Sequence, residues 1–153
     1  RDSYNTLMSC KPYLDRTDGV KHAVVTSSVL ARFGVPGQSA YVTSKTGLLG
    51  LVRSLAVEWS PQGIMVNAIC PGWVDTEMAQ NSIQALADMQ GISYEQSKAQ
   101  QEEILPANRM STPEEMAQWV SFLFSGLGDG EHGPRVETLT GQALDVNSGS
   151  WMG

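Results

Sequence analysis

Residues 22–45 read HAVVTSSVLARFGVPGQSAYVTSK, and this stretch decides both the fold and the candidate chemistry of the chain. The run at 23–26 (AVVT) is apolar and β-branched, which predicts a short buried strand. A loop over 29–39 follows, because its two glycines and its proline break regular structure. Ser39 is then expected to cap a helix, since a serine hydroxyl can accept a free N–H of the first turn.

The next helix and strand complete a strand–helix–strand unit. The helix runs to about Trp59 and has one apolar stripe at four- and three-residue steps, formed by Leu48, Val52, Leu55 and Trp59. The sequence SPQG at 60–63 ends the helix, and residues 64–70 predict a second buried strand. A connection of this length implies that the two strands are parallel and joined by a right-handed crossover.

The remaining segments extend this α/β pattern. Residues 1–17 predict a helix, 77–106 a helical excursion and 142–146 a last short strand. The sequence TPEE at 112–115 is a capping box with proline at the first helical position. The helix that it opens is expected to bury Met116, Trp119, Val120 and Leu123. Residues 1–153 therefore read as one α/β domain, the C-terminal half of a doubly wound parallel sheet of Rossmann type.

Tyr41 and Lys45 form the candidate catalytic pair. Residues four apart on a helix lie about 40° apart around its axis, so both side chains reach the same side. A free tyrosine titrates near pH 10, too high for a base at neutral pH, and a neighbouring ammonium favours the phenolate. A Tyr with a Lys four residues later is a weak signal alone, because such pairs are common on solvated helices.

Ser28 and the Pro71-Gly72 pair strengthen that signal. Ser28 lies thirteen residues before Tyr41 and follows the first strand, where open α/β sheets place ligands. Ser27 is the alternative, as a hydroxyl that only forms the turn. Pro71 and Gly72 follow the second strand and let the backbone turn sharply and approach a flat ring. Together these residues describe a device that moves a proton on or off an alcohol.

Four motifs in this order resemble the short-chain dehydrogenase/reductase family. They are the stretch 22–45, VNAICPGWVDTEM at 66–78, RMSTPEEMAQWVSFLFS at 109–125 and LTGQALDVNSGSWM at 139–152. Family members are longer, and this chain resembles their C-terminal portion. The phosphate-cradling glycine turn and the residues that select NAD or NADP would lie in the half that precedes it.

The resemblance implies an activity and a role for each catalytic residue. The family transfers hydride between NAD or NADP and a small-molecule secondary alcohol or ketone, without metal. Tyr41 would be the general acid or base, and Ser28 would hold the substrate oxygen. Lys45 would stabilise the phenolate and hold the ribose of the nicotinamide, which places Tyr41 and Lys45 against the cofactor as well.

The resemblance also implies cofactor contacts and a lid. Backbone groups of Val74 would meet the nicotinamide carboxamide, and the Thr76 hydroxyl would bind the carboxamide or the pyrophosphate, beside the turn at Pro71 and Gly72. The excursion at 77–106 occupies the place of the family's mobile substrate lid. A surface pair of helices with an ordinary core face is the alternative for this segment.

The family forms dimers and tetramers through two long helices, which correspond here to about 1–17 and 40–59. Their apolar faces favour a homodimer or a homotetramer. The turn VNSG at 146–149 departs from the Asp-Gly-Gly usual in the family, where it often contributes to subunit contacts.

Composition excludes several functional classes. The net charge is −6, with 10 Lys and Arg and no basic run, which argues against binding to nucleic acid or to an anionic membrane. No apolar run is long enough to predict a transmembrane span. Cys10 and Cys70 are expected to be buried free thiols, as in a reducing cytoplasm.

No motif predicts a metal site. His22 and His132 are isolated, and the cysteines lack metal-binding spacing. The G-x-G-x-x-G match at 128–133 follows a helix instead of a strand, so we interpret it as a flexible surface loop and not as a phosphate-binding fingerprint.

Two other functions stay open at this point. A regulatory or scaffold protein would keep the fold without turnover. An isomerase or lyase of the same family would use the Tyr–Lys pair for different chemistry.

Overall fold

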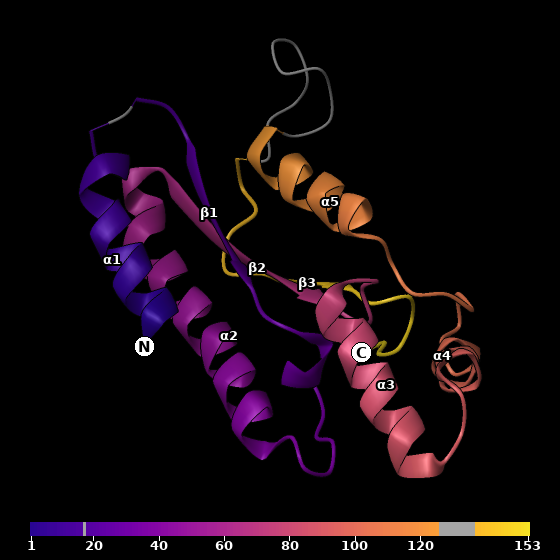
Figure 1. Cartoon of the computed structure of the whole chain (residues 1–153). Coiled ribbons are helices and arrows are strands. Elements are labelled where there is room, and N and C mark those ends of the chain that lie inside the picture. The colour runs from indigo at the N-terminus through magenta and orange to yellow at the C-terminus, as the bar shows by residue number, and fades with distance from the viewer. Residues whose placement is uncertain (17, 126–136) are drawn as a thin grey trace.

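The residues that the structure describes form a three-stranded parallel sheet with helices on both faces (Figure 1). The computed structural model describes residues 1–16, 18–125 and 137–153. The α-helices are α1 (Asp2–Leu14), α2 (Ser39–Trp59), α3 (Glu77–Gln90), α4 (Tyr94–Glu103) and α5 (Pro113–Ser125). The strands are β1 (Lys21–Thr26), β2 (Ile64–Pro71) and β3 (Ala143–Val146), and two 3-10 turns are η1 (Val29–Ala31) and η2 (Ser60–Gln62). The predicted α/β class is confirmed.

The strand order β1-β2-β3 places three carboxyl ends at one edge of the sheet. β1 pairs with β2 in parallel, with the register that joins Thr26 to Ile69, and β2 pairs with β3 in parallel through Ala68 and Ala143. Helices α1 and α2 lie on one face of the sheet and α5 lies on the other (Figure 1). This arrangement is the one that right-handed crossovers between parallel strands produce.

The main core lies between α2 and the sheet. Val52, Leu55 and Trp59 of α2 are each 1–2% exposed, as the predicted stripe requires. Leu48 is only half-buried, and Leu49 beside it is buried. Helix α1 covers this core with Leu7, Met8 and Leu14, and the Lys11 ammonium lies 5.7 Å from the centre of the Trp59 ring.

The excursion at 77–106 contains its own small core. Helices α3 and α4 pack together, and Ile83, Leu105 and Met110 form a second buried cluster against which Trp73 and Tyr94 pack. The buried Ser97 hydroxyl donates to the Ile83 carbonyl oxygen at 3.1 Å, which fixes the two helices to each other.

Three local expectations were wrong. Ser39 is the first residue of α2 and does not cap it, because Gln38 occupies the N-cap without a side-chain hydrogen bond. Trp119 is 43% exposed, because it lies at the flank of the buried face of α5 and packs on Phe122. Cys10 is exposed, because α1 turns other side chains toward the core.

Helix α5 is opened by the predicted capping box. The Glu115 amide donates to the Thr112 hydroxyl at 3.2 Å, and the Thr112 amide donates to the Glu115 carboxylate at 2.8 Å. Arg109 adds a guanidinium fork to the same carboxylate. The fork and the Thr112 amide hold the pKa of Glu115 at about 2, below its ordinary 4.5.

Gly72 and Gly47 provide a matched test of the packing. A Cβ at Gly72 would lie 2.9 Å from the Asn147 carbonyl oxygen, whereas the same atom at Gly47, on the exposed face of α2, would meet nothing within 4 Å. Gly72→Ala should therefore lower the free energy of unfolding by about 1–3 kcal/mol. Gly47→Ala should raise it by about 1 kcal/mol, because alanine favours the helix. Urea unfolding measures both, and shifts of the same sign would contradict the structure.

The capping carboxylate predicts a pH dependence of stability. A carboxyl whose pKa is lower in the folded than in the unfolded chain contributes stability above the unfolded value, and the contribution is lost as pH falls. Glu115→Gln should thus be less resistant to thermal unfolding than the parent above pH 5, with a difference that shrinks between pH 4.5 and pH 2. Arg109→Gln should remove most of the same pH-dependent difference. A difference that stays constant over this range would refute the assignment.

Candidate active site

Ser28 lies at the carboxyl end of β1 and begins the turn η1. Its hydroxyl accepts a hydrogen bond from the Leu30 amide at 3.2 Å, so Ser28 is the N-cap of η1. The side chain is 7% exposed. A hydroxyl that accepts from the backbone keeps its own proton available to a substrate oxygen.

Ser27 differs from Ser28 in what its hydroxyl binds. Ser27 is 3% exposed, and its hydroxyl donates to the backbone carbonyl oxygen of Lys45 at 2.9 Å. Its amide donates to Ile69 of β2 at 2.8 Å and so extends the ladder of the sheet. The two neighbouring serines thus have separate environments. The hydroxyl proton of Ser27 is used in a hydrogen bond within the protein and is not available to a substrate.

Tyr41 and Lys45 lie on one side of α2, near its amino end. The Lys45 ammonium is 5.6 Å from the centre of the Tyr41 ring and donates to the Thr26 carbonyl oxygen at 3.1 Å. Tyr41 is 36% exposed. Lysine therefore joins the tyrosine to the end of β1, two residues before Ser28. Within residues 1–16, 18–125 and 137–153, no hydrogen bond joins the Tyr41 hydroxyl directly to Ser28.

Four of the six predicted cofactor residues lie at the end of β2 and in the turn that follows it: Pro71 is the last residue of β2, and Gly72, Val74 and Thr76 come after it. Gly72 packs against the backbone of Asn147, and its amide donates to the Val146 carbonyl oxygen at 3.2 Å, directly after Pro71. Val74 bridges to Ser111 as in a parallel sheet. This turn therefore holds three segments together: the end of β2, the end of β3 and the exit of the excursion.

Thr76 caps α3. Its hydroxyl accepts from the Ala79 amide at 3.4 Å and donates to the Val74 carbonyl oxygen at 3.2 Å. A threonine hydroxyl has one proton and two lone pairs. The proton is already used, so this oxygen can serve a ligand only as an acceptor.

Sequence reasoning missed Arg32, which fastens the Ser28 turn to β3. Its guanidinium donates to both oxygens of the Asp145 carboxylate, at 3.1 and 3.0 Å, and to the Ala143 carbonyl oxygen at 3.1 Å. Trp151 stacks on the same guanidinium at 4.9 Å. The hydrogen bond to Asp145 raises the pKa of Arg32 further. No local pattern signals this pairing, because its partners are 113 residues apart.

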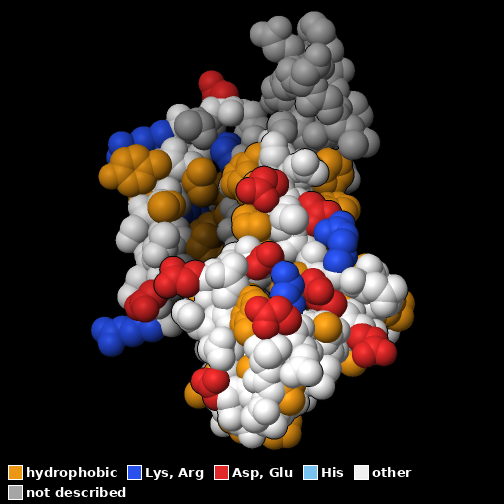
Figure 2. Space-filling view, turned by 45° about the vertical axis from the view of Figure 1, so that its right-hand side comes forward, with side chains coloured by type: hydrophobic (Ala, Val, Ile, Leu, Met, Phe, Trp, Pro, Cys, Tyr) orange, Lys and Arg blue, Asp and Glu red, His pale blue; other side chains and the backbone are white. Residues whose placement is uncertain are grey.

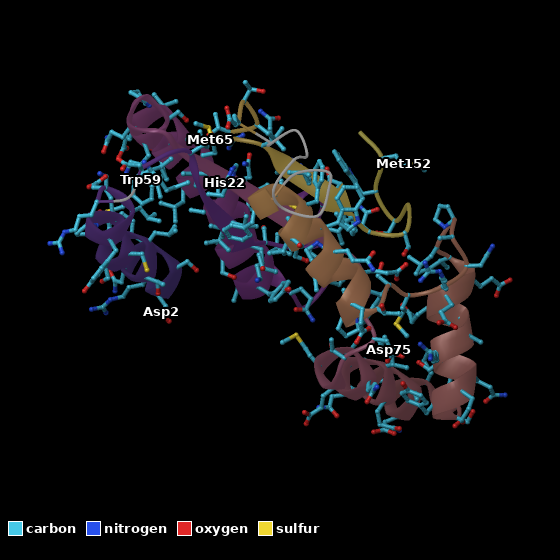
Figure 3. All side chains as sticks on the ribbon, turned by 90° about the horizontal axis from the view of Figure 1, so that it is seen from above. Asp2, His22, Trp59, Met65, Asp75 and Met152 are labelled. Carbon is cyan, nitrogen blue, oxygen red and sulfur yellow. The ribbon has the colours of Figure 1, made fainter. Side chains whose placement is uncertain are left out.

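The buried Cys70 and the partly buried His22 are titratable groups that lie near the sheet but outside this constellation. Burial raises the pKa of the Cys70 thiol, which contacts the Ser27 hydroxyl and the Ser28 backbone. Burial also lowers the pKa of His22, which packs edge-on against Phe124 of α5 (Figure 3). Both effects favour the neutral form, so neither group brings a charge to the site.

One face of the molecule is mixed in charge. Acidic and basic side chains are interspersed over the face in Figure 2, and Lys98 lies 3.9 Å from Asp75 at the start of the excursion. A hollow of about 560 Å³ lies along α3, and a second of about 590 Å³ lies between α2 and Thr140. Ser28, Tyr41 and Lys45 line neither hollow.

The described residues hold no group of three His, Cys, Asp or Glu side chains that suits a metal ion, and none of their helices is long and apolar enough to cross a membrane. The glycine-rich match at 128–133 and His132 lie outside the described residues.

Comparison with known proteins identifies the family of the chain. Residues 3–150 match the family described as enoyl-(acyl carrier protein) reductase. The chain superimposes on a short chain dehydrogenase family protein from Francisella tularensis with a TM-score of 0.82 and 28% identity, over 96% of this chain and 57% of that one. This chain belongs to the short-chain dehydrogenase/reductase family.

Two further members of the short-chain dehydrogenase/reductase family show its range. The 3-oxoacyl-[acyl-carrier-protein] reductase FabG of Aquifex aeolicus is 36% identical, over 80% of this chain and 42% of the relative. A structure of actinorhodin polyketide ketoreductase with NADPH is 32% identical, with a TM-score of 0.75, over 86% of this chain and 48% of that one. The chain thus spans about half the length of the curated relatives it matches.

Arg32→Lys should loosen the turn that contains Ser28 in this short-chain dehydrogenase/reductase. Lysine is a point charge and cannot bind the Asp145 carboxylate and the Ala143 carbonyl in one plane. The expected loss is about 1 kcal/mol in the free energy of unfolding, with faster amide hydrogen exchange at 29–31. Arg53→Lys, on the exposed face of α2, should change neither quantity. Equal exchange rates in parent and Arg32→Lys would show that the fork does not fix the turn.

Proposed function

We propose that the protein containing this chain is an NAD(P)-dependent oxidoreductase that interconverts a secondary alcohol and a ketone. The observation that carries the proposal is the position of Lys45, which lies 5.6 Å from the Tyr41 ring and binds the end of β1 beside Ser28. The family of the chain and the ketoreductase names of its relatives support the same activity.

Tyr41 acts as the general acid or base. In oxidation its phenolate takes the hydroxyl proton, a C=O bond forms, and the hydrogen on the carbinol carbon leaves with its electron pair. In reduction the tyrosine returns the proton to the oxygen. Ser28 holds the substrate oxygen by hydrogen bonding and stabilises the charge that develops there. Lys45 stabilises the phenolate through its positive charge.

NAD or NADP, when bound, would accept or supply the hydride. The chain has a donor and acceptor set that fits it. An ammonium has three N–H donors, and among the described contacts Lys45 uses one, on Thr26, which leaves two for ribose hydroxyls. The lone pair left on the Thr76 hydroxyl fits the amide N–H of a carboxamide, which favours that group over the pyrophosphate.

The excursion formed by α3 and α4 is proposed as the substrate lid, which excludes water when it closes. We further propose a homodimer or homotetramer in the cytoplasm. The apolar stripe of α2 faces the sheet and is not available to a partner. The outward face that would meet a second copy presents Val57 instead, which is 79% exposed.

Tyr41→Phe tests the acid–base assignment. The change removes one half-exposed hydroxyl and should leave the unfolding midpoint unchanged, whereas turnover should fall by about 10²- to 10⁴-fold. The assay follows the absorbance of the reduced nicotinamide with pools of secondary alcohols and ketones and with both cofactors. Tyr13→Phe, at a tyrosine that is 70% exposed on α1, is the matched control and should keep parental rates.

The outcomes separate the alternatives. Parental rates in Tyr41→Phe would refute the role of the tyrosine. A full-length protein that fails to quench or shift nicotinamide fluorescence would be a scaffold. Binding of the cofactor without any change in its absorbance over the whole substrate panel would point to isomerase or lyase chemistry.

A further inference from the structure

Ser27 is a buried hydroxyl that the catalytic constellation does not use. It is 3% exposed, and its proton goes to the carbonyl oxygen of Lys45 at 2.9 Å. The contact joins β1 to α2 across 18 residues of chain. A carbonyl within a helix already accepts the N–H four residues later, so Ser27 occupies the second lone pair of that oxygen.

Lys45 is therefore held at both of its ends by consecutive residues. Its carbonyl accepts from the Ser27 hydroxyl, and its ammonium donates to the Thr26 carbonyl oxygen at 3.1 Å. These two bonds fix the position of α2 along the direction of β1. They do so at Lys45, the residue that must face Tyr41. Because a helix rises 1.5 Å per residue, a small slide of α2 moves the ammonium away from both the tyrosine and the ribose position.

The other side of Ser27 is fixed by β2. Its amide donates to the Ile69 carbonyl oxygen at 2.8 Å. The thiol of Cys70, which is fully buried, contacts the Ser27 hydroxyl and the Ser28 backbone. Ser27 thus connects the central strand β2, through its amide, to helix α2, through its hydroxyl. Helix α2 contains the proposed catalytic pair.

We propose that Ser27 is a positioning residue for the reaction, and that its hydroxyl acts through Lys45 by fixing the height of α2 against the end of β1. The inference rests on the proposed function. It assigns a role to the serine beside Ser28 that neither the motif nor the family resemblance supplied. Ser27 itself touches neither substrate nor cofactor in this scheme.

A double-mutant cycle between Ser27→Ala and Lys45→Ala in the full-length protein tests this role. Loss of one hydrogen bond to the lysine backbone should raise the cofactor dissociation constant and lower kcat by roughly five- to tenfold. The KM for the alcohol should stay within twofold, because Ser28 is untouched. In the Lys45→Ala background, Ser27→Ala should change the cofactor dissociation constant by less than twofold, since residues that act through one another are not additive.

Ser44→Ala is the matched control. The Ser44 hydroxyl donates to the backbone carbonyl oxygen of Tyr41 at 2.7 Å, but this bond lies within α2 and does not join it to the sheet. Ser44→Ala should therefore leave kcat and the cofactor dissociation constant within twofold of the parent. Ser27→Cys, measured in a reducing buffer, places a weaker donor at the same position and should give an intermediate effect. It also serves as the variant of the cycle if Ser27→Ala does not fold.

Each result decides between the roles. Ser27→Ala could change the cofactor dissociation constant by the same factor with and without the Lys45 side chain. That result would show a general structural role for Ser27 and would overturn the positioning role, but it would leave the proposed function standing. Equal effects of Ser27→Ala and Ser44→Ala would do the same. A parent protein that neither binds nor turns over a nicotinamide cofactor would sink the proposed function and this inference together.

Discussion

The packing of α2 against the sheet is the constraint on which the candidate site depends. Val52, Leu55 and Trp59 are almost fully buried, and each contributes roughly 1.5–3 kcal/mol by leaving water. These contacts are not directional, however, so a small slide of the helix changes their energy little. Catalysis is more sensitive, because a misplacement of 1 Å can lower the rate by about 10²-fold. Apolar packing therefore presses α2 onto the sheet, and the hydrogen bonds at Lys45 determine its register there.

Local sequence patterns predicted the helices and strands well, because each pattern depends on residues that are close together in the sequence. The stripe of α2 and the capping box of Thr112 and Glu115 are examples. The candidate serine, tyrosine and lysine were predicted from their spacing together with the family resemblance, and only Tyr41 and Lys45 are in contact in the structure. The fork between Arg32 and Asp145 and the approach of Gly72 to Asn147 were not predictable, because they join residues that are adjacent only after the parallel sheet has formed.

Residues of the candidate site differ in how much the fold alone explains them. Gly72 is required by the backbone of Asn147, and the Thr76 hydroxyl caps α3, so both would be retained in a protein that bound no cofactor. Tyr41 is different. It is 36% exposed, and its hydroxyl has no hydrogen-bond partner among the described residues. A phenol that has no partner in the fold, beside a lysine that the fold anchors, is the arrangement that the proposed acid–base role requires.

The turn from Asn147 to Trp151 shows how the unusual VNSG sequence preserves this arrangement. Ser148 replaces a glycine of the family pattern although its φ is 54°, a left-handed conformation that costs a side chain roughly 1–2 kcal/mol. Its carbonyl oxygen accepts from Ala107 and its hydroxyl lies 3.3 Å from that of Ser111, at about 1 kcal/mol for each hydrogen bond. A glycine would also accept the Ala107 bond, so only the contact with the Ser111 hydroxyl is specific to serine, and it offsets part of the strain. Together the two bonds connect the exit of the proposed lid to the turn that follows β3, the strand to which Arg32 binds.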